Sequence, residues 1–376
     1  MTDPAATAEW FAREPSSLIL QPTTLCNLNC VYCYLPERAK KRDMTVEVAA
    51  AIADGIPAGW PSMGAIDVVW HGGEPLTVGP ESFLKLIRPF EQLRVAGRVK
   101  QVIQTNATLV TEQWCDVFSA YDVAVGVSID GPPAENIGRV DWRGRPVFDR
   151  IVAGIERLKR HGISFTVIAV VGKSQISQAK IILDFLRDLG CAQVGLNLEE
   201  QEGVNTRAGT PSADQARRFW RDTIEWAHAN PEVSVREIVQ LLDFLTLTPD
   251  RRSSDTKHDL IPTIGVTGDV VLLSPELLGT QAPAYGNFIA GNVTQEPLSS
   301  ILDRAPGLRY VKDFARGIEN CKSTCEFFAV CQGSHAGNRY FEHRDFTVTE
   351  TEHCKTSTQA LVLAMADLTL ERSRAC

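Results

Sequence analysis

The chain carries, close to its start, the run Ser17-Leu-Ile-Leu-Gln-Pro-Thr-Thr-Leu-Cys-Asn-Leu-Asn-Cys-Val-Tyr-Cys-Tyr34. Its apolar first part, 17–23, predicts a buried strand, and three cysteines follow in the spacing C-x3-C-x2-C, at Cys26, Cys30 and Cys33. Ferredoxin-type [4Fe-4S] clusters take four protein thiolates, so three thiolates on one loop leave one iron without a protein ligand. We therefore expect a [4Fe-4S] cluster after this strand, with one iron open to a ligand or substrate.

The same three cysteines also fit a structural zinc site or ordinary thiols. Zinc takes four ligands, and the nearest histidine, His71, is far along the chain. The place of the loop favours a functional site, because the C-terminal ends of the strands form the mouth of an α/β barrel.

The composition limits the class of protein. A net charge of −8 without a long basic tract argues against nucleic acid as the main partner. No apolar run is long enough to predict a membrane span, and residues 1–10 lack the basic start and apolar core of a signal peptide. Ten cysteines in such a chain indicate metal ligation in a reducing compartment, and we expect the cytoplasm.

Strand-like and helix-like patterns alternate from residue 17 to about residue 198, which predicts an α/β fold with a parallel sheet. The predicted strands are 17–23, 65–71, 99–105, 123–130, 164–171 and 193–198. The predicted helices between them are 45–56, 79–94, 111–121, 146–161 and 177–189. Six repeats are too few for a complete eight-fold barrel, and alternation alone fits a doubly wound sheet equally well.

The second half of the chain changes character. Helical patterns occupy much of 212–245, a polar linker follows at 248–257, a hairpin is predicted at 263–273, and a closing helix at about 358–372. We expect a core, a helical linker and a cysteine-rich domain, with the boundaries 15–235, 236–260 and 261–376.

Four further cysteines lie in the cysteine-rich part, with the spacing C-x3-C-x5-C-x22-C: Cys321, Cys325, Cys331 and Cys354. Four thiolates match a closed cluster with no open iron, and a zinc site takes the same number of ligands. Spacing alone does not choose between the two. Cys115 and Cys191 are interpreted as buried, inert thiols.

Three motifs stand where predicted strands end. They are His71-Gly-Gly-Glu-Pro75, Gln104-Thr-Asn-Ala-Thr-Leu109, and Val127-Ser-Ile-Asp-Gly-Pro132 with Arg139 after it. Glycines let a backbone approach a ligand closely, and an arginine fork suits a carboxylate. For Arg139, the alternative is a solvated loop charge, and its neighbours Arg143 and Arg145 offer the same chemistry.

Together with the first three cysteines, these motifs resemble the signature of the radical S-adenosylmethionine (SAM) enzymes. The resemblance implies a partial (β/α)6 barrel. It also implies that the amino and carboxylate groups of SAM fill the open iron site. An electron from the reduced cluster then cleaves SAM, and the 5′-deoxyadenosyl radical abstracts a hydrogen atom. A flavodoxin- or ferredoxin-type protein is the implied electron donor.

The resemblance also implies roles for individual residues. Gly72, Gly73 and Glu74 bind the SAM amino group, while Ser128 and Arg139 contact its ribose and carboxylate. Adenine meets the backbone of Tyr32 and the side chain of Leu198, for which plain core packing is the alternative. Gln104 opens an element that is similar to one in peptide-modifying members, with Ala107 where the family usually has glycine.

The C-terminal cysteines resemble a SPASM or twitch extension, which carries an auxiliary [4Fe-4S] cluster. A full SPASM domain uses additional upstream cysteines, and the predicted hairpin at 263–273 contains none. The resemblance therefore implies one auxiliary cluster held by Cys321, Cys325, Cys331 and Cys354.

Several phrases narrow the resemblance to maturases of ribosomally made peptides, the glycine-rich-repeat and FxS-type branch: 196–203, 273–279, 288–293 and 338–342. Members of that branch join an aromatic side chain to the β-carbon of a nearby residue, which gives cyclophane-bridged peptides. The implied partner is a precursor peptide. Cys331-Gln-Gly-Ser-His335 departs from the Cys-Gly-Gly-Gly form that is common there.

Acidic residues supply candidates for a catalytic base. Glu199 and Glu200 lie at the expected barrel mouth, and Asp269 and Glu276 lie in and after the hairpin. A solvated acidic loop is the alternative for the first pair. The rival functions are a sulfatase-maturase-like dehydrogenase, a thioether-forming maturase and a non-catalytic iron–sulfur carrier. A tRNA-modifying enzyme is disfavoured by the acidic balance.

Overall fold

The computed structural model describes residues 7–206, 209–246 and 257–375. Within them, one ten-stranded sheet runs in the order β10-β9-β8-β1-β2-β3-β4-β5-β6-β7. The core strands are β1 (Ser17–Leu20), β2 (Ile66–Trp70), β3 (Val99–Thr105), β4 (Ala124–Ser128), β5 (Phe165–Val171), β6 (Gln193–Leu198) and β7 (Ser234–Val235). All of these pair in parallel, as the alternation predicts.

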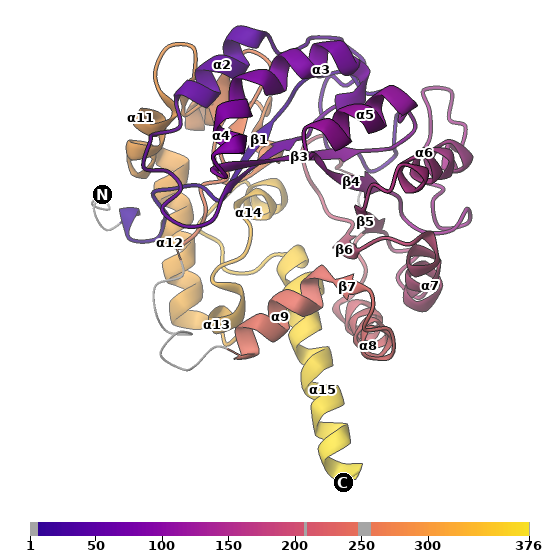
Figure 1. Ribbon diagram of the computed structural model, residues 1–376. Helices are drawn as coiled ribbons and strands as arrows, with labels where there is room; N and C mark the ends of the chain where they lie inside the picture. The colour runs from indigo at the N-terminus through magenta and orange to yellow at the C-terminus, as the bar shows by residue number, and fades with distance from the viewer. Residues whose placement is uncertain (1–6, 207–208, 247–256, 376) are drawn as a thin grey trace.

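The helices that connect the strands lie on the outer side of the curved sheet (Figure 1). They are α2 (Val46–Asp54), α3 (Pro80–Ile87), α4 (Glu91–Val95), α5 (Glu112–Ala120), α6 (Phe148–Arg160), α7 (Ala179–Leu189) and α8 (Ala213–Ala229). A doubly wound sheet carries connecting helices on both faces, so the arrangement is that of a partial barrel.

Local sequence explains where several helices begin and end. The side chain of Thr45 caps α2 by accepting a hydrogen bond from the Val48 amide, and Thr111 caps α5 in the same way. Gly190 ends α7 in the left-handed conformation, with φ of 83°.

The helical pattern predicted over 79–94 exists as α3 and α4, which are joined by a 3-10 turn at Arg88–Phe90. Pro89 has no N–H to donate, which removes one hydrogen bond of a continuous α-helix at this point.

The C-terminal hairpin extends the same sheet. Strand β8 (Thr263–Ile264) pairs in parallel with β1, while β9 (Asp269–Val271) and β10 (Gly291–Asn292) continue it in antiparallel fashion. The predicted hairpin therefore exists.

The remaining helices cover the open side of the sheet and the region below it. They are α9 (Arg236–Thr246), α11 (Leu298–Asp303), α12 (Arg309–Thr324), α13 (Phe328–Cys331), α14 (Ala336–His343) and α15 (Ala360–Ala375), the last preceded by a π-helical turn at Cys354–Gln359. In Figure 1, α14 lies in the middle of the molecule, between the sheet and α13. The C-terminal part thus reaches the inside of the partial barrel.

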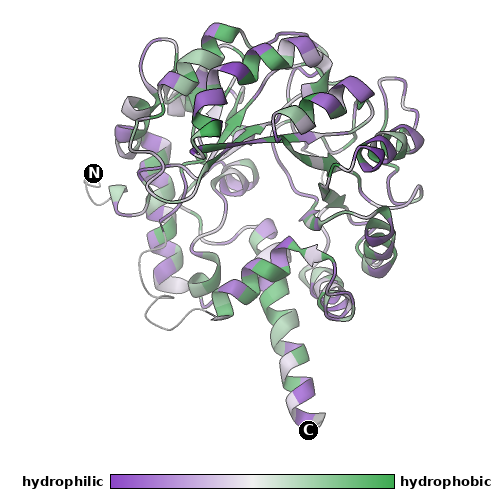
Figure 2. Ribbon diagram, viewed as in Figure 1, coloured by the Kyte–Doolittle hydropathy of each residue, from purple (hydrophilic) through white to green (hydrophobic). Residues whose placement is uncertain are grey.

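Packing fixes the barrel core and the chain end. The ring of Trp70 lies 5.3 Å from Phe83, and its indole N–H donates to Gln101 at 2.7 Å. Trp220 of α8 donates to the Thr356 carbonyl at 2.8 Å, which ties α8 to the turn before α15. Figure 2 shows the strands as mainly hydrophobic and the outer helices as mixed. Among the described residues, no helix combines the length and the apolar character needed to cross a bilayer.

Candidate active site

The loop that carries the first three cysteines follows β1, at the carboxyl end of the barrel strands. Backbone hydrogen bonds hold it at both sides: the Cys26 amide donates to Arg38, and the Glu74 amide donates to Leu25. Burial raises the pKa of the Cys26 thiol, and the neighbouring Glu74, Cys30 and Cys33 raise it further. The three thiols stand on one short loop, in which the Cys33 amide donates to the Cys30 carbonyl at 3.2 Å. A metal centre stabilises thiolates placed on such a loop.

The turn after β2 needs its glycines in order to lie against this loop. A Cβ on Gly73 would lie 2.6 Å from the carbonyl oxygens of both Leu25 and Thr23, and its φ is +62°. Any side chain here would push the turn off the cysteine loop.

Glu74 ties together two strand ends. Its carboxylate is buried and accepts hydrogen bonds from the Thr105 hydroxyl at 2.6 Å, the Asn106 amide at 2.8 Å and the Leu76 amide at 3.1 Å. Burial raises the pKa of Glu74 to about 7. Sequence reasoning did not assign Thr105 and Asn106, although both stand in the motif that ends β3.

Arg139 is buried rather than solvated, so the loop-charge alternative was wrong. It is 6% exposed and pairs with Asp130 at 2.7 Å, whereas Arg145 pairs with Asp141 on the surface. The Nε–H of Arg139 is buried without a hydrogen-bond partner among the described residues. The guanidinium lies beside the cysteine loop, with its central carbon 5.5 Å from the centre of the Tyr32 ring. A carboxylate ligand fits such a donor.

Asp130 is a site residue that sequence reasoning missed. Fully buried, it accepts hydrogen bonds from the Tyr32 hydroxyl, Arg139 and, at 2.9 Å, the Val170 amide. The ring of Tyr32 packs on Gly138, where a Cβ would lie 2.7 Å from the ring. The side chain of Tyr32 is thus engaged in packing. A polar residue two positions after β4 was the available signal.

Two further predicted residues meet on neighbouring strands. Gln104 of β3 donates to the Ser128 hydroxyl of β4 at 2.8 Å. Gly126 leaves room for this contact, since a Cβ there would lie 2.1 Å from the Gln104 side-chain oxygen. Leu198 is buried at the end of β6.

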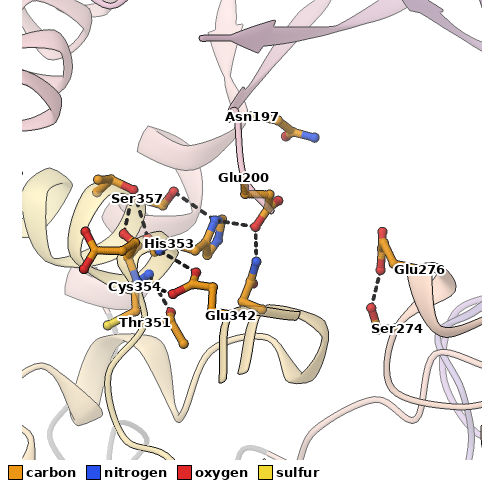
Figure 3. Close-up of polar contacts among 12 residues, drawn as sticks. Asn197, Glu200, Ser274, Glu276, Glu342, Thr351, His353, Cys354 and Ser357 are labelled. Carbon is orange, nitrogen blue, oxygen red and sulfur yellow. Dashed lines mark hydrogen bonds and ion pairs between the residues drawn. The ribbon is translucent and has the colours of Figure 1, made fainter. Parts of the chain in front are cut away.

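An acidic cluster follows β6, on the side of the barrel that α14 and the η3 turn (Pro275–Leu277) cover. Figure 3 shows Glu200 pointing toward His353, with Glu276 and Ser274 across from it. Glu200 pairs with His353 at 2.8 Å and accepts a hydrogen bond from Asn338. Glu199 lies apart from these contacts, 3.5 Å from Asn205.

The acids of this cluster differ in the direction in which their pKa values are shifted. Burial opposes the charge of Glu200, but His353 and Asn338 hold its pKa below the ordinary value. Burial raises the pKa of Glu276, and the nearby Glu200 raises it further. The pKa of Glu202 is raised by the same causes, burial first and then Glu276 and Glu200. Carboxyls whose pKa values are shifted in opposite directions therefore lie side by side.

Asp269 is placed differently from these acids. Its carboxylate accepts hydrogen bonds from Thr267 at 2.8 Å and Asn292 at 2.9 Å, both in the β8–β10 region. The described contacts therefore bring Glu276 into the acidic cluster and use Asp269 to shape the hairpin.

The four C-terminal cysteines line one cavity. Its other lining residues include Arg339, His335 and Thr351. Burial raises the pKa of the thiols of Cys321, Cys331 and Cys354, which a bound cation would offset. In the described part of the chain, no three histidine, cysteine or acidic side chains are grouped as the ligands of a single metal ion. The thiols instead surround a shared space.

Comparison with known proteins places this site in a family. The model of the radical SAM superfamily matches residues 20–186. An uncharacterised protein of Synechocystis sp. is 33% identical over 353 residues, covering 90% of this chain and 88% of that protein.

Sulfatase-maturating enzymes are also similar in sequence. The serine-type anaerobic sulfatase-maturating enzyme of Bacteroides thetaiotaomicron is 33% identical over 196 residues, which cover 50% of this chain and 47% of that enzyme. The cysteine-type enzyme of Clostridium perfringens is 26% identical over 346 residues, which cover 85% of this chain and 88% of that enzyme.

Solved structures share the fold. The structure of anSMEcpe with bound AdoMet and Cp18Cys peptide has a TM-score of 0.75 at 18% identity, covering 96% of this chain and 99% of that one. Streptococcus suis SuiB bound to the precursor peptide SuiA has a TM-score of 0.66 at 16% identity, covering 93% and 78%. The predicted fold class is confirmed, and the chain belongs to the radical SAM superfamily.

Proposed function

We propose that this protein is a radical SAM maturase that modifies a peptide or protein substrate. Cys26, Cys30 and Cys33 would hold a [4Fe-4S] cluster, which together with bound SAM would supply the radical for hydrogen abstraction. Cys321, Cys325, Cys331 and Cys354 would hold an auxiliary [4Fe-4S] cluster. Support comes from the similar sulfatase-maturating enzymes and from two solved structures of similar fold: anSMEcpe with bound AdoMet and Cp18Cys peptide, and SuiB bound to the precursor peptide SuiA.

One observation carries the proposal: Tyr34 joins the cysteine loop to the acidic cluster. Its hydroxyl lies 2.9 Å from His71 of the Gly-Gly-Glu turn. Burial raises the pKa of Tyr34, and the charges of Glu276, Glu202 and Cys33 raise it further. The Tyr34 carbonyl accepts a hydrogen bond from the Val204 amide at 3.0 Å, so Tyr34 also contacts the segment after β6 that carries Glu202. A substrate between them would meet the radical source on one side and proton acceptors on the other.

The chain's own residues have separable tasks in this proposal. Gly72, Gly73 and Glu74 shape the turn that receives the SAM amino group, and the unpaired N–H of Arg139 receives its carboxylate. Gln104, Ser128, Leu198 and the backbone of Tyr32 form the nucleoside side of the pocket. Glu276, with Glu202 beside it, accepts the substrate proton, because a carboxyl with a raised pKa is the better base near neutral pH.

The type of modification has two candidates. Oxidation of the sulfatase-maturase type is supported by the similar sulfatase-maturating enzymes. The match to the cysteine-type enzyme of Clostridium perfringens spans 88% of that enzyme's length. A cyclophane crosslink between an aromatic ring and a β-carbon is supported by the phrases around Leu196, Leu273 and Asn338. We propose a flavodoxin- or ferredoxin-type electron donor and a cytoplasmic location for either reaction.

The test is anaerobic turnover of the reconstituted protein with SAM and a reductant. The substrates are sulfatase-derived peptides with serine or cysteine, and aromatic peptides encoded by neighbouring reading frames. We expect 5′-deoxyadenosine and a substrate that has lost two hydrogens, and tandem mass spectrometry distinguishes an oxidised side chain from a crosslink. Absence of 5′-deoxyadenosine, with both clusters loaded, would contradict the proposal.

A further inference from the structure

Arg339, in α14, is a fully buried arginine that contacts a cysteine thiol. It is 2% exposed. Its Nη2 donates to Cys321 Sγ at 3.1 Å and to the Gly333 carbonyl at 2.6 Å, and its Nη1 donates to the Phe346 carbonyl at 3.0 Å. The guanidinium carbon lies 5.1 Å from the centre of the Phe314 ring. Together, these contacts hold the guanidinium in one orientation.

The neighbouring helix leaves a space of the right shape for this group. Gly317 of α12 faces the guanidinium, and a Cβ there would lie 1.8 Å from Arg339 Nη1 and 2.2 Å from the Phe346 carbonyl oxygen. Only glycine permits this close approach. The pocket around Arg339 is thus formed by backbone carbonyls, an aromatic face and one sulfur.

The charge of Arg339 lacks a carboxylate partner. Among the ion pairs of the described residues, none involves Arg339, whereas the other deeply buried arginine, Arg139, pairs with Asp130. A guanidinium does not lose its proton in proteins, and an uncompensated buried charge is strongly unfavourable. Burial lowers the pKa of Arg339, and the charges of Cys321, Cys331 and Cys354 oppose that shift. The negative charge that Arg339 requires must therefore come from the four-cysteine cavity.

We propose that Arg339 is a positioning residue that orients the Cys321 thiolate and compensates the negative charge of the iron–sulfur cluster in the four-cysteine cavity, keeping that cluster easier to reduce. This inference rests on the auxiliary cluster of the proposed function. One-electron reduction adds a negative charge to a cluster, so a fixed positive charge in contact with a ligand sulfur favours the reduced form.

The test is a redox titration of the auxiliary cluster, followed by electron paramagnetic resonance. The full chain is used with Cys26, Cys30 and Cys33 replaced by alanine, so that only the four-cysteine cluster contributes. Three variants are compared: Arg339→Gln, which removes the charge, Arg339→Lys, which keeps it, and Arg344→Gln as the matched control. Arg344 is exposed, lies over the Tyr340 ring, and stands at the C-terminal end of α14, the helix that carries Arg339.

We expect Arg339→Gln to shift the reduction equilibrium at least tenfold toward the oxidised form, a potential lower by about 59 mV for one electron. Arg339→Lys shifts it by much less, and Arg344→Gln leaves it unchanged. An Arg339→Gln protein that binds four irons at an unchanged potential would overturn the inference. So would an Arg339→Lys protein whose potential falls as far as that of Arg339→Gln, because the charge would then not set the potential.

Failure of the underlying function gives a different result. If the parent chain, with Arg339 intact, binds zinc or no metal at the four cysteines, the auxiliary cluster itself is wrong. Metal analysis of that parent protein decides this before any Arg339 variant is measured.

Discussion

The two cysteine sites each have a buried arginine beside them, and the two arginines are neutralised in different ways. Arg139, next to the first site, pairs with the buried carboxylate of Asp130 at 2.7 Å. Arg339, next to the second, contacts the sulfur of Cys321 at 3.1 Å and backbone carbonyls. The first site thus carries its own counter-charge, and the second depends on what the cysteines bind.

This difference matches the proposed roles of the sites. An open site that receives a charged cofactor needs a donor held ready without the ligand, and Asp130 holds Arg139 in that position. A closed site is filled once, so its arginine can rely on the resident group for charge balance. The folding of the second region is therefore expected to depend more on its metal centre.

The largest effect that separates the sites is on SAM cleavage. Replacing Cys26, Cys30 and Cys33 together by alanine should reduce 5′-deoxyadenosine formation to background, because no cluster remains to bind SAM. Cys354→Ala should spare part of the SAM cleavage and abolish the modified product. Both are measured by chromatography of anaerobic reactions. Equal loss of SAM cleavage in the two proteins would remove the distinction between the sites.

Next in size is the effect of removing the counter-charge at the first site. Asp130→Asn leaves Arg139 buried without an anion, and we expect a loss of about 3–5 kcal/mol in the free energy of unfolding. Glu156→Gln, which removes an exposed pair with Lys159, serves as the control and should cost about 1 kcal/mol or less. Urea denaturation of the metal-free proteins measures both. Similar losses in the two variants would show that burial of the Asp130 pair does not matter.

A pH effect of smaller size is expected from Glu74. Burial raises its pKa to about 7 in the folded protein, from an ordinary value of 4.5. The folded state therefore holds this proton more tightly than the unfolded state, and its stabilising contribution falls as pH rises through about 7. We expect a loss of roughly 2–3 kcal/mol between pH 4.5 and pH 8 from this group.

The matched variant for this prediction is Glu74→Gln, which cannot titrate and keeps one oxygen to accept from Thr105 and Leu76, while the Asn106 amide loses its acceptor. Its unfolding free energy, measured by denaturation of the metal-free protein across this range, should lack that part of the pH dependence. A variant with the same pH profile as the unchanged protein would assign the dependence to other groups.

The smallest effect is expected from an ion pair that joins α8 to α15. Arg217 pairs with Asp367 in a geometry with two hydrogen bonds, both groups being about one-third exposed. Asp367→Asn should lower the free energy of unfolding by about 1 kcal/mol or less and leave both cysteine sites unchanged. Thermal unfolding together with iron analysis checks this. Loss of iron from the variant would show that this ion pair supports the four-cysteine site.

Much of the fold was predictable because its signals are local. All six predicted core strands exist, and α2 and α5 begin at threonines, Thr45 and Thr111, whose side chains cap them. The change from α-helix to a 3-10 turn at Pro89 was also predictable from the sequence, since proline lacks the N–H that a helix interior uses. Local chemistry therefore decides most element boundaries.

The partners of buried charges were not predictable in this way. Nothing near Arg139 in sequence shows that it pairs with Asp130 rather than with solvent, and Glu276 joins Glu200 only through the way α14 and the η3 turn close the barrel. Such contacts join distant segments and leave no periodic pattern in the chain. Arg339 lies in the segment 338–342, which resembles the peptide maturases, but its contact with Cys321 appears only in the structure.

The most direct test of the central claim is electron paramagnetic resonance of the reduced protein with both clusters loaded, before and after addition of SAM. The account predicts that SAM changes the spectrum of the cluster held by Cys26, Cys30 and Cys33 and leaves that of the four-cysteine cluster unchanged. A spectrum unaffected by SAM, or a change that persists after alanine replaces those three cysteines, would contradict it.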